Sequence, residues 1–262
     1  MIIVFSGTGN SLAVAHGLRK RLGGELCVLE REVLLNPSGR VLEVPQGEDV
    51  VWVFPVYSWG VPPVVAGFIR KSKIKGAHEA QHFMVCTCGD DIGRADDQWR
   101  SLIGRRGWSP RGAFSVQMPN TYVLMKGFEV DSPEVAAGKL ASMPERLDTV
   151  AAAIRRGYSE SDVVRGSSAW LKTAVVYPLF RRFCMSPRPF HATDACTSCG
   201  LCSRSCPMEN ISMAPGGTDE CNSRPSWGNR CALCLRCYHI CPAHAVAYGH
   251  ETASKGQKQI LK

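Results

Sequence analysis

The sequence predicts an α/β protein in which a doubly wound, five-stranded parallel sheet is followed by a small α+β domain. Over residues 1–157, short runs of apolar residues are separated by segments of helical periodicity. The apolar runs do not alternate with polar residues, which is typical of parallel strands covered on both faces. After Pro187 and Pro189 the composition shifts to Cys, Ser and Pro. That second region is too small to fold on apolar burial alone, so we expect metal to stabilise it.

The elements of the first region follow in order along the chain. Five strands are expected at Met1–Phe5, Leu26–Leu29, Val50–Val56, His82–Thr87 and Gly112–Met118. Helices are expected at Asn10–Leu22, Pro63–Lys71, Asp91–Arg105 and from Ser132 to Arg156. Ser132 and Pro133 are the preferred N-cap and first-turn residues of the last helix, and Gly157 ends it. Ligands of such sheets bind beyond the carboxyl ends of the strands, which points to the loops at 6–11, 55–60 and 87–93.

Eight of the thirteen cysteines form two identical runs. Each run has the spacing C-x₂-C-x₂-C-x₃-C-P, which is the run of bacterial two-cluster ferredoxins. The runs are Cys196, Cys199, Cys202, Cys206 and Cys231, Cys234, Cys237, Cys241. A zinc ribbon is the alternative, but it uses C-x₂-C pairs without a third step. The repetition therefore predicts two [4Fe-4S] clusters over residues 190–250.

The spacing also predicts which cysteines share a cluster. A two-residue step brings three thiolates onto one cube, whereas the fourth cysteine, before proline, points to the other cube. One cluster is then expected on Cys196, Cys199, Cys202 and Cys241. The other is expected on Cys231, Cys234, Cys237 and Cys206.

The first loop, Ser6-Gly7-Thr8-Gly9-Asn10-Ser11, is rich in hydroxyls and opens a helix. Hydroxyl groups together with the N–H groups of a helix N-terminus can hold an anion. The loop has no Lys, so it is not a Walker A loop, and Leu12 stands where a dinucleotide fingerprint needs a third glycine. A phosphate monoester is the ligand that this loop suits.

The other two loops offer groups for a flat ring. Tyr57, Ser58, Trp59 and Gly60 follow the third strand, and Cys88, Gly89 and Asp90 follow the fourth. In this order, the three loops resemble those of flavodoxins, which implies a sheet of order 2-1-3-4-5 that binds flavin mononucleotide (FMN). By that resemblance Ser6, Thr8, Gly9, Asn10 and Ser11 hold the phosphate, and the other loops flank the isoalloxazine. An ordinary core position is the alternative for Trp59.

The resemblance has one departure. Many flavodoxins place a Tyr three residues beyond the aspartate to stack on the second ring face, whereas this chain has Gly93. The second face is then expected to be covered by the cluster domain or by Pro119-Asn120-Thr121-Tyr122.

The whole chain resembles the flavodoxin–ferredoxin fusion family (EFR1 family ferredoxins). The resemblance implies a flavodoxin-like domain at 1–157, a linker with an apolar helix at 158–189, a two-cluster domain at 190–250 and a basic tail at 251–262. We expect the tail, with Lys255, Lys258 and Lys262, to be a solvated end. The apolar segment 168–183 is expected to form a helix broken near Pro178 that packs between the domains. Contact with a partner or with a membrane surface is the alternative for this segment.

Composition limits the location and the partners. The formal charge is +8, but clusters and thiolates bring it to about +4, and no basic run is interleaved with aromatic residues, so no nucleic acid is expected. No stretch is long and apolar enough for a transmembrane segment.

The N-terminus lacks the pattern of a secretory leader, and the cysteines have ligand spacing, so we expect the chain to be in a reducing cytoplasm. Five cysteines outside the two runs are expected to be spare thiols: Cys27, Cys86, Cys88, Cys184 and Cys221. A redox role is the alternative for Cys86 and Cys88.

The leading functional hypothesis is electron transfer. Cubane clusters carry single electrons, whereas a flavin takes one or two, and linking them in one chain raises transfer rates through effective concentration. We therefore expect a carrier of low-potential electrons that serves a partner redox enzyme as donor or acceptor. The alternative is an FMN-dependent reductase acting on NAD(P)H or on a small substrate. A redox sensor is a third hypothesis, although no output domain is visible.

Overall fold

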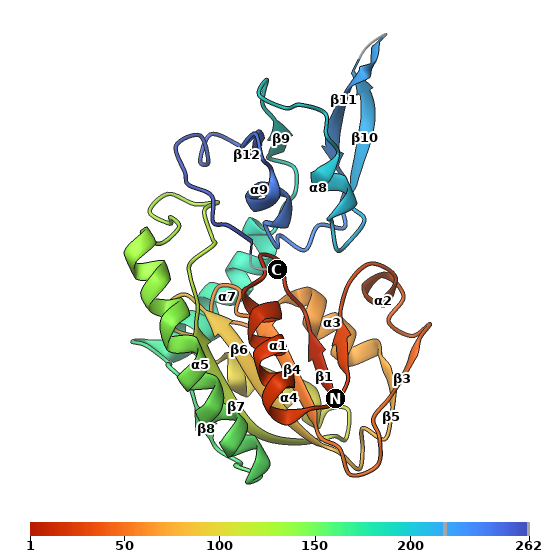
Figure 1. Ribbon diagram of the computed structural model, residues 1–262, viewed down its shortest axis with the longest axis vertical. Coiled ribbons are helices and arrows are strands. Elements are labelled where there is room, and N and C mark those ends of the chain that lie inside the picture. Colours follow the sequence, from red (N-terminus) through yellow and green to blue (C-terminus); the bar gives the residue numbers. More distant parts are fainter. Residues whose placement is uncertain (217–218, 261–262) are drawn as a thin grey trace.

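The computed structural model describes residues 1–216 and 219–260, with side chains described outside 215–222. Its larger part is a six-stranded sheet of order β2-β1-β4-β6-β7-β8, in which every pair of neighbours is parallel (Figure 1). The strands are β1 (Ile2–Val4), β2 (Leu26–Val28), β4 (Val50–Pro55), β6 (Gln81–Cys88), β7 (Ser109–Gln117) and β8 (Ser161–Asp162). If β8 is left out and only the strands of this sheet are numbered along the chain, the order is 2-1-3-4-5, the flavodoxin-like order.

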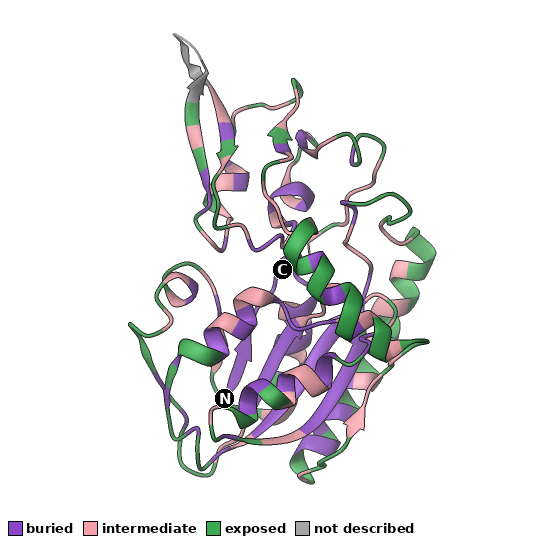
Figure 2. Ribbon diagram, turned by 180° about the vertical axis from the view of Figure 1, so that it is seen from behind, coloured by how far each residue is buried: buried purple, intermediate pink, exposed green. Residues whose placement is uncertain are grey.

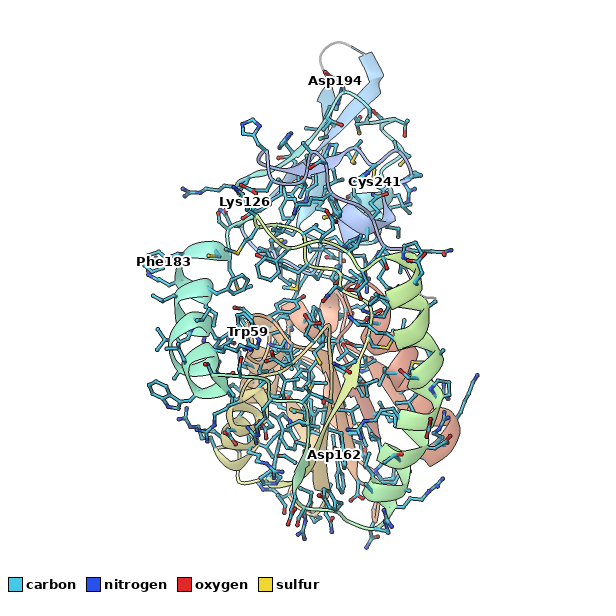
Figure 3. All side chains as sticks on the ribbon, turned by 90° about the vertical axis from the view of Figure 1, so that its left-hand side faces the viewer. Trp59, Lys126, Asp162, Phe183, Asp194 and Cys241 are labelled. Atoms are coloured by element: carbon cyan, nitrogen blue, oxygen red, sulfur yellow. The ribbon has the colours of Figure 1, made fainter. Side chains whose placement is uncertain are left out.

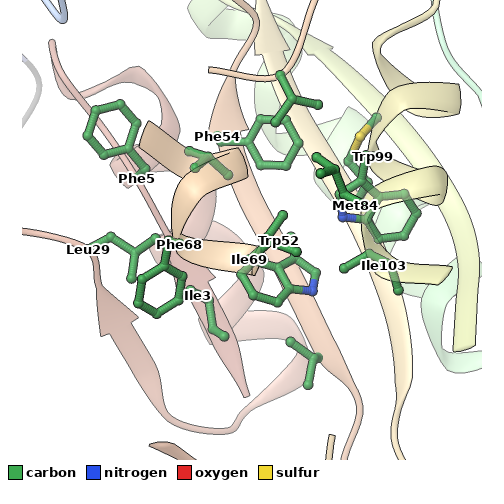
Figure 4. Close-up of a cluster of buried hydrophobic side chains, with 14 of the residues drawn as sticks. Ile3, Phe5, Leu29, Trp52, Phe54, Phe68, Ile69, Met84, Trp99 and Ile103 are labelled. Atoms are coloured by element: carbon green, nitrogen blue, oxygen red, sulfur yellow. The ribbon is translucent and has the colours of Figure 1, made fainter. Parts of the chain in front are cut away.

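Helices cover both faces of the sheet. They are α1 (Asn10–Leu22), α5 (Pro133–Arg155), α3 (Pro63–Lys71) and α4 (Ala95–Gly104). Alternate residues of each strand pack into two separate cores, with Ile3, Trp52 and Met84 on the face of α3 and α4 (Figure 4) and Val4, Val53 and Val85 on the face of α1 and α5. Because both faces are buried, β1 and β4 are continuous apolar runs, as predicted, whereas β7 also contains Arg111, Ser115 and Gln117.

The prediction of five strands was wrong in detail. The sixth strand, β8, has only two residues and lies in the segment expected to be linker. A second parallel pair, β3 (Val41–Glu43) with β5 (Lys73–Lys75), lies outside the main sheet, and α2 (Glu32–Leu35) is a single turn. β8 consists of two polar residues, and β3 and β5 each bury only their central side chain, so none of the three is a buried apolar run in the sequence.

The C-terminal part has its own small core around the cysteine runs. It contains β9 (Phe190–Ala192), α8 (Leu201–Arg204), α9 (Arg236–Ile240) and β12 (Val246–Tyr248), with β9 antiparallel to β12. A hairpin of β10 (Ile211–Gly216) and β11 (Asp219–Trp227) connects the two cysteine runs. The side chain of Cys221 lies outside the described residues. Tyr238, which is fully buried, is part of this core together with Leu233 and Val246.

One continuous helical run joins the two parts. It consists of α6 (Ala169–Leu171), η1 (Lys172–Val176), α7 (Tyr177–Leu179) and η2 (Phe180–Cys184). The expected break near Pro178 is wrong. The N–H of Tyr177 bonds to the carbonyl of Lys172, five residues back, so the helix widens into π-type turns and continues through the proline.

The tail is also not a free end. Tyr238 donates its hydroxyl proton toward the carbonyls of Lys255 and Gly256, at 3.0 and 3.2 Å. The N–H of Lys258 bonds to Nδ1 of His239 at 3.0 Å. The tail therefore packs on the C-terminal part up to residue 258, whereas Lys262 lies outside the described residues.

Within the described part of the chain, no helix is both long enough and apolar enough to cross a membrane.

A buried histidine in the sheet makes the stability depend on pH. His82 accepts a hydrogen bond at Nδ1 from Trp52 at 3.0 Å and bonds the Ala77 carbonyl through Nε2 at 2.8 Å. Burial lowers the pKa of His82 to about 4 from the ordinary 6.5. The unfolded chain therefore binds more protons between these values, so stability is complete above about pH 6.5 and falls as the pH drops toward 4.

We expect the wild-type chain to lose about 1 kcal/mol more stability than a His82→Gln variant between pH 7.5 and 5.5. Unfolding midpoints in urea at the two pH values measure this difference. The second buried histidine, His239, whose burial also lowers its pKa to about 4, is present in both proteins and cancels. An equal loss in both proteins would show that His82 is not responsible.

Candidate functional site

The three predicted loops meet at the carboxyl edge of the sheet. Parallel pairing of β1 with β4 and of β4 with β6 places their ends side by side, so the following loops lie next to each other. They line a cavity of about 990 Å³. Ten of the predicted residues line it: Ser6, Thr8, Asn10, Ser11, Tyr57, Ser58, Trp59, Cys88, Gly89 and Asp90. The cavity is at the upper end of the range of small-molecule sites.

The first loop offers buried polar groups that could hold an anion. Gly9, with φ of 90°, takes the left-handed conformation that starts α1, and it does not itself line the cavity. Ser6 is only 2% exposed, and its hydroxyl has no hydrogen-bond partner among the described residues. An unsatisfied buried hydroxyl costs about 1–3 kcal/mol. A phosphate oxygen accepting from Ser6 would remove this cost, so the loop fits the phosphate of FMN.

Ser11 is one of the residues expected to hold the phosphate, and its hydroxyl also has a partner in the protein. Its Oγ is 2.8 Å from Oγ1 of Thr87, which also lines the cavity. This hydrogen bond connects the start of α1 to the end of β6. Asn10 makes a second connection, because its amide donates to the carbonyl of Pro119 at 2.8 Å.

The Trp59 loop is stabilised by the helical run. Ser58 and Trp59 have φ of 44° and 62°, a region that is uncommon for residues with a side chain. Thr173 donates its hydroxyl proton to the carbonyl of Trp59 at 2.8 Å, and the ammonium of Lys172 lies 5.0 Å from the centre of the indole. Figure 3 shows Trp59 between this helical run and the strand ends. Trp59 is half-buried beside the cavity, so it is not an ordinary core position.

Gly60 does not line the cavity, in contrast to the prediction. A Cβ at this position would lie 2.5 Å from the ring of Tyr177. The hydroxyl of Tyr177 donates to the carbonyl of Val61. Gly60 therefore allows the helical run to approach the loop, and its role is packing.

The Cys88 loop brings a thiol and the carboxyl groups of Asp90 and Asp91 to the cavity. Burial, and after it the charges of Asp91 and Asp90, raise the pKa of the Cys88 thiol to about 12. Burial likewise raises the pKa of Cys86 far above its ordinary value. Both groups are therefore thiols at neutral pH, and a thiol is a poor nucleophile and redox group.

Two further segments close the cavity opposite these loops. Pro119, Asn120, Thr121 and Tyr122 line it, and so do Leu233, Cys234 and Leu235 of the second cysteine run. Asp131 accepts two hydrogen bonds from Asn120, one from its backbone N–H at 2.9 Å and one from its side-chain amide at 3.0 Å. Burial opposes ionisation of Asp131, but the hydrogen bonds from Lys139 and Asn120 outweigh it and lower its pKa. Gly93 is not in the lining, since it packs against Thr173 and Trp59.

The cysteines lie in two groups, and in each group the fourth cysteine comes from the other run. Cys196, Cys199 and Cys202 share a small cavity with Cys241. In the other group, burial first, and then the charges of Cys234, Cys231 and Cys206, raise the pKa of Cys237, which shows that the four lie close together. Among the described residues, no three His, Cys, Asp or Glu side chains converge on a site for a single ion.

Backbone N–H groups point at three of these sulfurs. Asn210 donates to Sγ of Cys206 at 3.4 Å, Leu233 to Cys231 at 3.3 Å and Ala245 to Cys241 at 3.2 Å. Hydrogen bonds to sulfur are one of the means by which a protein sets the potential of a cluster.

Arg236 joins the second cysteine run to the first loop. Its guanidinium donates to the carbonyls of Gly7 at 2.8 Å, Ser6 at 2.7 Å and Ser205 at 3.1 Å, and pairs with Glu30 at 2.6 Å. A Cβ on Gly7 would collide with the carbonyl of Cys234. The first loop and the second cysteine run therefore share one wall of the cavity. These contacts connect residues far apart in the chain, so no local pattern could have predicted them.

Residues 195–246 match a family of 4Fe-4S dicluster domains. No curated protein matches the chain. Among solved structures, it is similar to the Trp repressor binding protein from Bacillus subtilis, at 14% identity and a TM-score of 0.36, over 56% of this chain and 96% of that one. It is also similar to an NAD(P)H:quinone oxidoreductase from Methanothermobacter marburgensis, at 12% identity and a TM-score of 0.33, over 57% and 94% of the two chains. The dicluster match supports 4Fe-4S clusters in the C-terminal part.

Proposed function

We propose that this chain is an electron-transfer protein that relays low-potential electrons between FMN, two [4Fe-4S] clusters and a partner redox enzyme in the cytoplasm. The observation that carries the proposal is the shared wall. The second cysteine run lines the same cavity as the first loop, through Leu233, Cys234 and Leu235. Two carriers in one chain and in contact exchange electrons without waiting for a diffusional encounter.

The first loop holds the phosphate of FMN and the other two hold its ring. Ser6 and Thr8 donate hydroxyl protons, and the N-terminus of α1 favours a negative charge. The Trp59 loop flanks one side of the isoalloxazine and Cys88, Gly89 and Asp90 the other. When bound, FMN supplies a centre that accepts one or two electrons.

Each cluster takes three cysteines from one run and the fourth from the other. Cys196, Cys199, Cys202 and Cys241 hold the first cluster, whereas Cys231, Cys234, Cys237 and Cys206 hold the second. The second cluster is the one beside the flavin, because Cys234 lines both sites. Cys199 of the first cluster is exposed, so this cluster faces the partner. The order is partner, first cluster, second cluster, flavin, and electrons can pass in either direction.

Replacing Ser6 with alanine tests the flavin site. We expect the Ser6→Ala variant to bind FMN about tenfold more weakly, because one hydrogen bond to a charged group is lost. Its iron content should stay that of the wild type. Ser101→Ala, on an exposed position of α4, is the matched control and should bind FMN normally. Titration of the flavin-free protein with FMN, followed by fluorescence, measures both variants. Unchanged affinity of Ser6→Ala would contradict the assignment.

The size of the cavity favours one second candidate function. Its lining extends beyond the three loops to Met125, Phe128 and Phe183, which leaves room for a molecule beside the flavin. An FMN-dependent reductase acting on NAD(P)H or a small substrate would use this space. Anaerobic mixing with NADH or NADPH separates the two functions. Rapid bleaching of the flavin band by either nucleotide favours the reductase, whereas no bleaching favours the carrier.

A further inference from the structure

The outer face of the helical run 169–184 is apolar and open to solvent. Thr173, Tyr177 and Phe180 are buried against the body of the protein, so the other faces point outward. Figure 2 shows this run as a mostly exposed ribbon across the outside of the molecule. The large exposed apolar side chains are Trp170, Leu171, Val175, Val176, Leu179 and Phe183, and Trp170 and Phe183 are 62% and 69% exposed. Contiguous exposed apolar surface of this kind marks an interaction site.

A neighbouring loop extends this face. Tyr122 packs edge-on against Phe180 of the helical run and against Phe128, with ring centres 6.1 and 5.4 Å apart. Met125 and Phe128 on this loop are themselves 41% and 44% exposed. Helix and loop therefore form one surface, which we call the apolar face.

Basic side chains border the apolar face. Lys126, Arg181 and Arg182 are exposed (Figure 3 marks Lys126 and Phe183 on the same side of the molecule). Of the acidic groups beside the face, Asp91 is paired with a basic side chain, whereas Glu129 is held by backbone N–H groups and keeps its charge. Asp91 pairs with Lys172 at 2.6 Å, and Glu129 accepts the N–H groups of Val130 at 2.9 Å and Gly256 at 3.0 Å.

We propose that the apolar face docks on an anionic lipid bilayer. A surface-lying helix with Trp, Phe and Leu on one side and flanking basic residues is the pattern of interfacial helices. Its aromatic residues stand at both ends of the run, so the whole face can enter the interface at a shallow depth. A second copy of this chain fits less well, because a two-fold contact would bring Arg181 and Arg182 against the same positive patch.

Docking would also place the cavity beside the lipid. Leu179 and Phe183 belong both to the apolar face and to the cavity lining, as do Met125 and Phe128. The proposal goes beyond electron transfer and does not depend on which cofactor fills the cavity.

Flotation of the intact, cofactor-loaded protein with vesicles tests the proposal. We expect binding to vesicles of phosphatidylcholine with about one-third phosphatidylglycerol, and roughly 100-fold weaker partitioning to phosphatidylcholine alone, since each of three basic residues adds about fivefold. The double variant Arg181→Gln/Arg182→Gln should lose most of this preference. Raising the salt from 0.1 to 0.5 M should weaken binding in the same way.

The apolar contribution is tested by Trp170→Glu, since Trp170 does not line the cavity. We expect this variant to bind anionic vesicles at least tenfold more weakly with unchanged iron and flavin contents. Val135→Glu, on an apolar residue at the start of α5 that is 50% exposed, is the matched control and should bind as the wild type. Equal losses in both variants, or absence of vesicle binding, would overturn the proposal. So would a dimer in light scattering that Trp170→Glu dissociates, which would assign the face to a second copy.

Discussion

Replacing Cys206 with serine is expected to remove the cluster of the second run and to leave that of the first. Cys206 is the last cysteine of the first run but lies near Cys231, Cys234 and Cys237 in space. A thiolate ligand is then missing from the flavin-side cluster only. Iron and acid-labile sulfide should fall from about eight to about four per chain. Cys241→Ser should cause the same loss in the other cluster.

Double variants identify which cysteines share a cluster. Cys206→Ser with Cys231→Ser should lose no more iron than either alone, because both serve one cluster. Cys206→Ser with Cys196→Ser should lose nearly all the iron, because two clusters are affected. This is the logic of a double-mutant cycle applied to iron content. The reverse pattern, with Cys206 coupled to Cys196, would contradict the exchange of the fourth cysteines.

Replacing Gly7 with alanine is expected to separate the flavin site from the second cluster. The added Cβ would collide with the carbonyl of Cys234. Gly7 is not among the glycines with positive φ, so alanine brings no backbone strain, and the collision is the only effect. Overpacking of this kind costs typically 1–3 kcal/mol. We therefore expect FMN to bind about 10- to 100-fold more weakly and to be reduced more slowly through the clusters, with iron unchanged.

Stopped-flow reduction of the flavin by dithionite-reduced clusters and an FMN titration measure the two effects of Gly7→Ala. Gly138→Ala is the matched control, because a Cβ on this exposed residue of α5 meets nothing within 4 Å. Wild-type FMN affinity and transfer rate in Gly7→Ala would show that the contact with Cys234 does not matter.

Much of the fold could be predicted because its determinants are local. The runs at Ile2–Val4 and Val50–Pro55 are apolar throughout, since both faces of the sheet are covered, and α1 and α3 have the predicted bounds. The exceptions have physical reasons. β8 has only two residues, too few for a pattern. At Pro178 the helix continues because the turn before it is of the π type, although proline usually ends a helix.

For the candidate site, the sequence predicted which loops form it but not the contacts between them. The hydroxyls of the first loop and the position of Trp59 follow from residues next to strand ends. The pairing of Ser11 with Thr87 and the packing of Gly60 under Tyr177 depend on contacts between distant segments. The same holds for Arg236, whose bonds to Ser6 and Gly7 span more than two hundred residues of sequence. Such contacts are set by tertiary packing, which a single sequence does not show.

We expect one chain to hold a flavin and two clusters together. Chemical analysis of protein purified without oxygen measures all three. We expect one FMN with about eight iron and eight sulfide per chain. Zinc in place of iron, or a full complement of iron with no binding of added FMN, would contradict it.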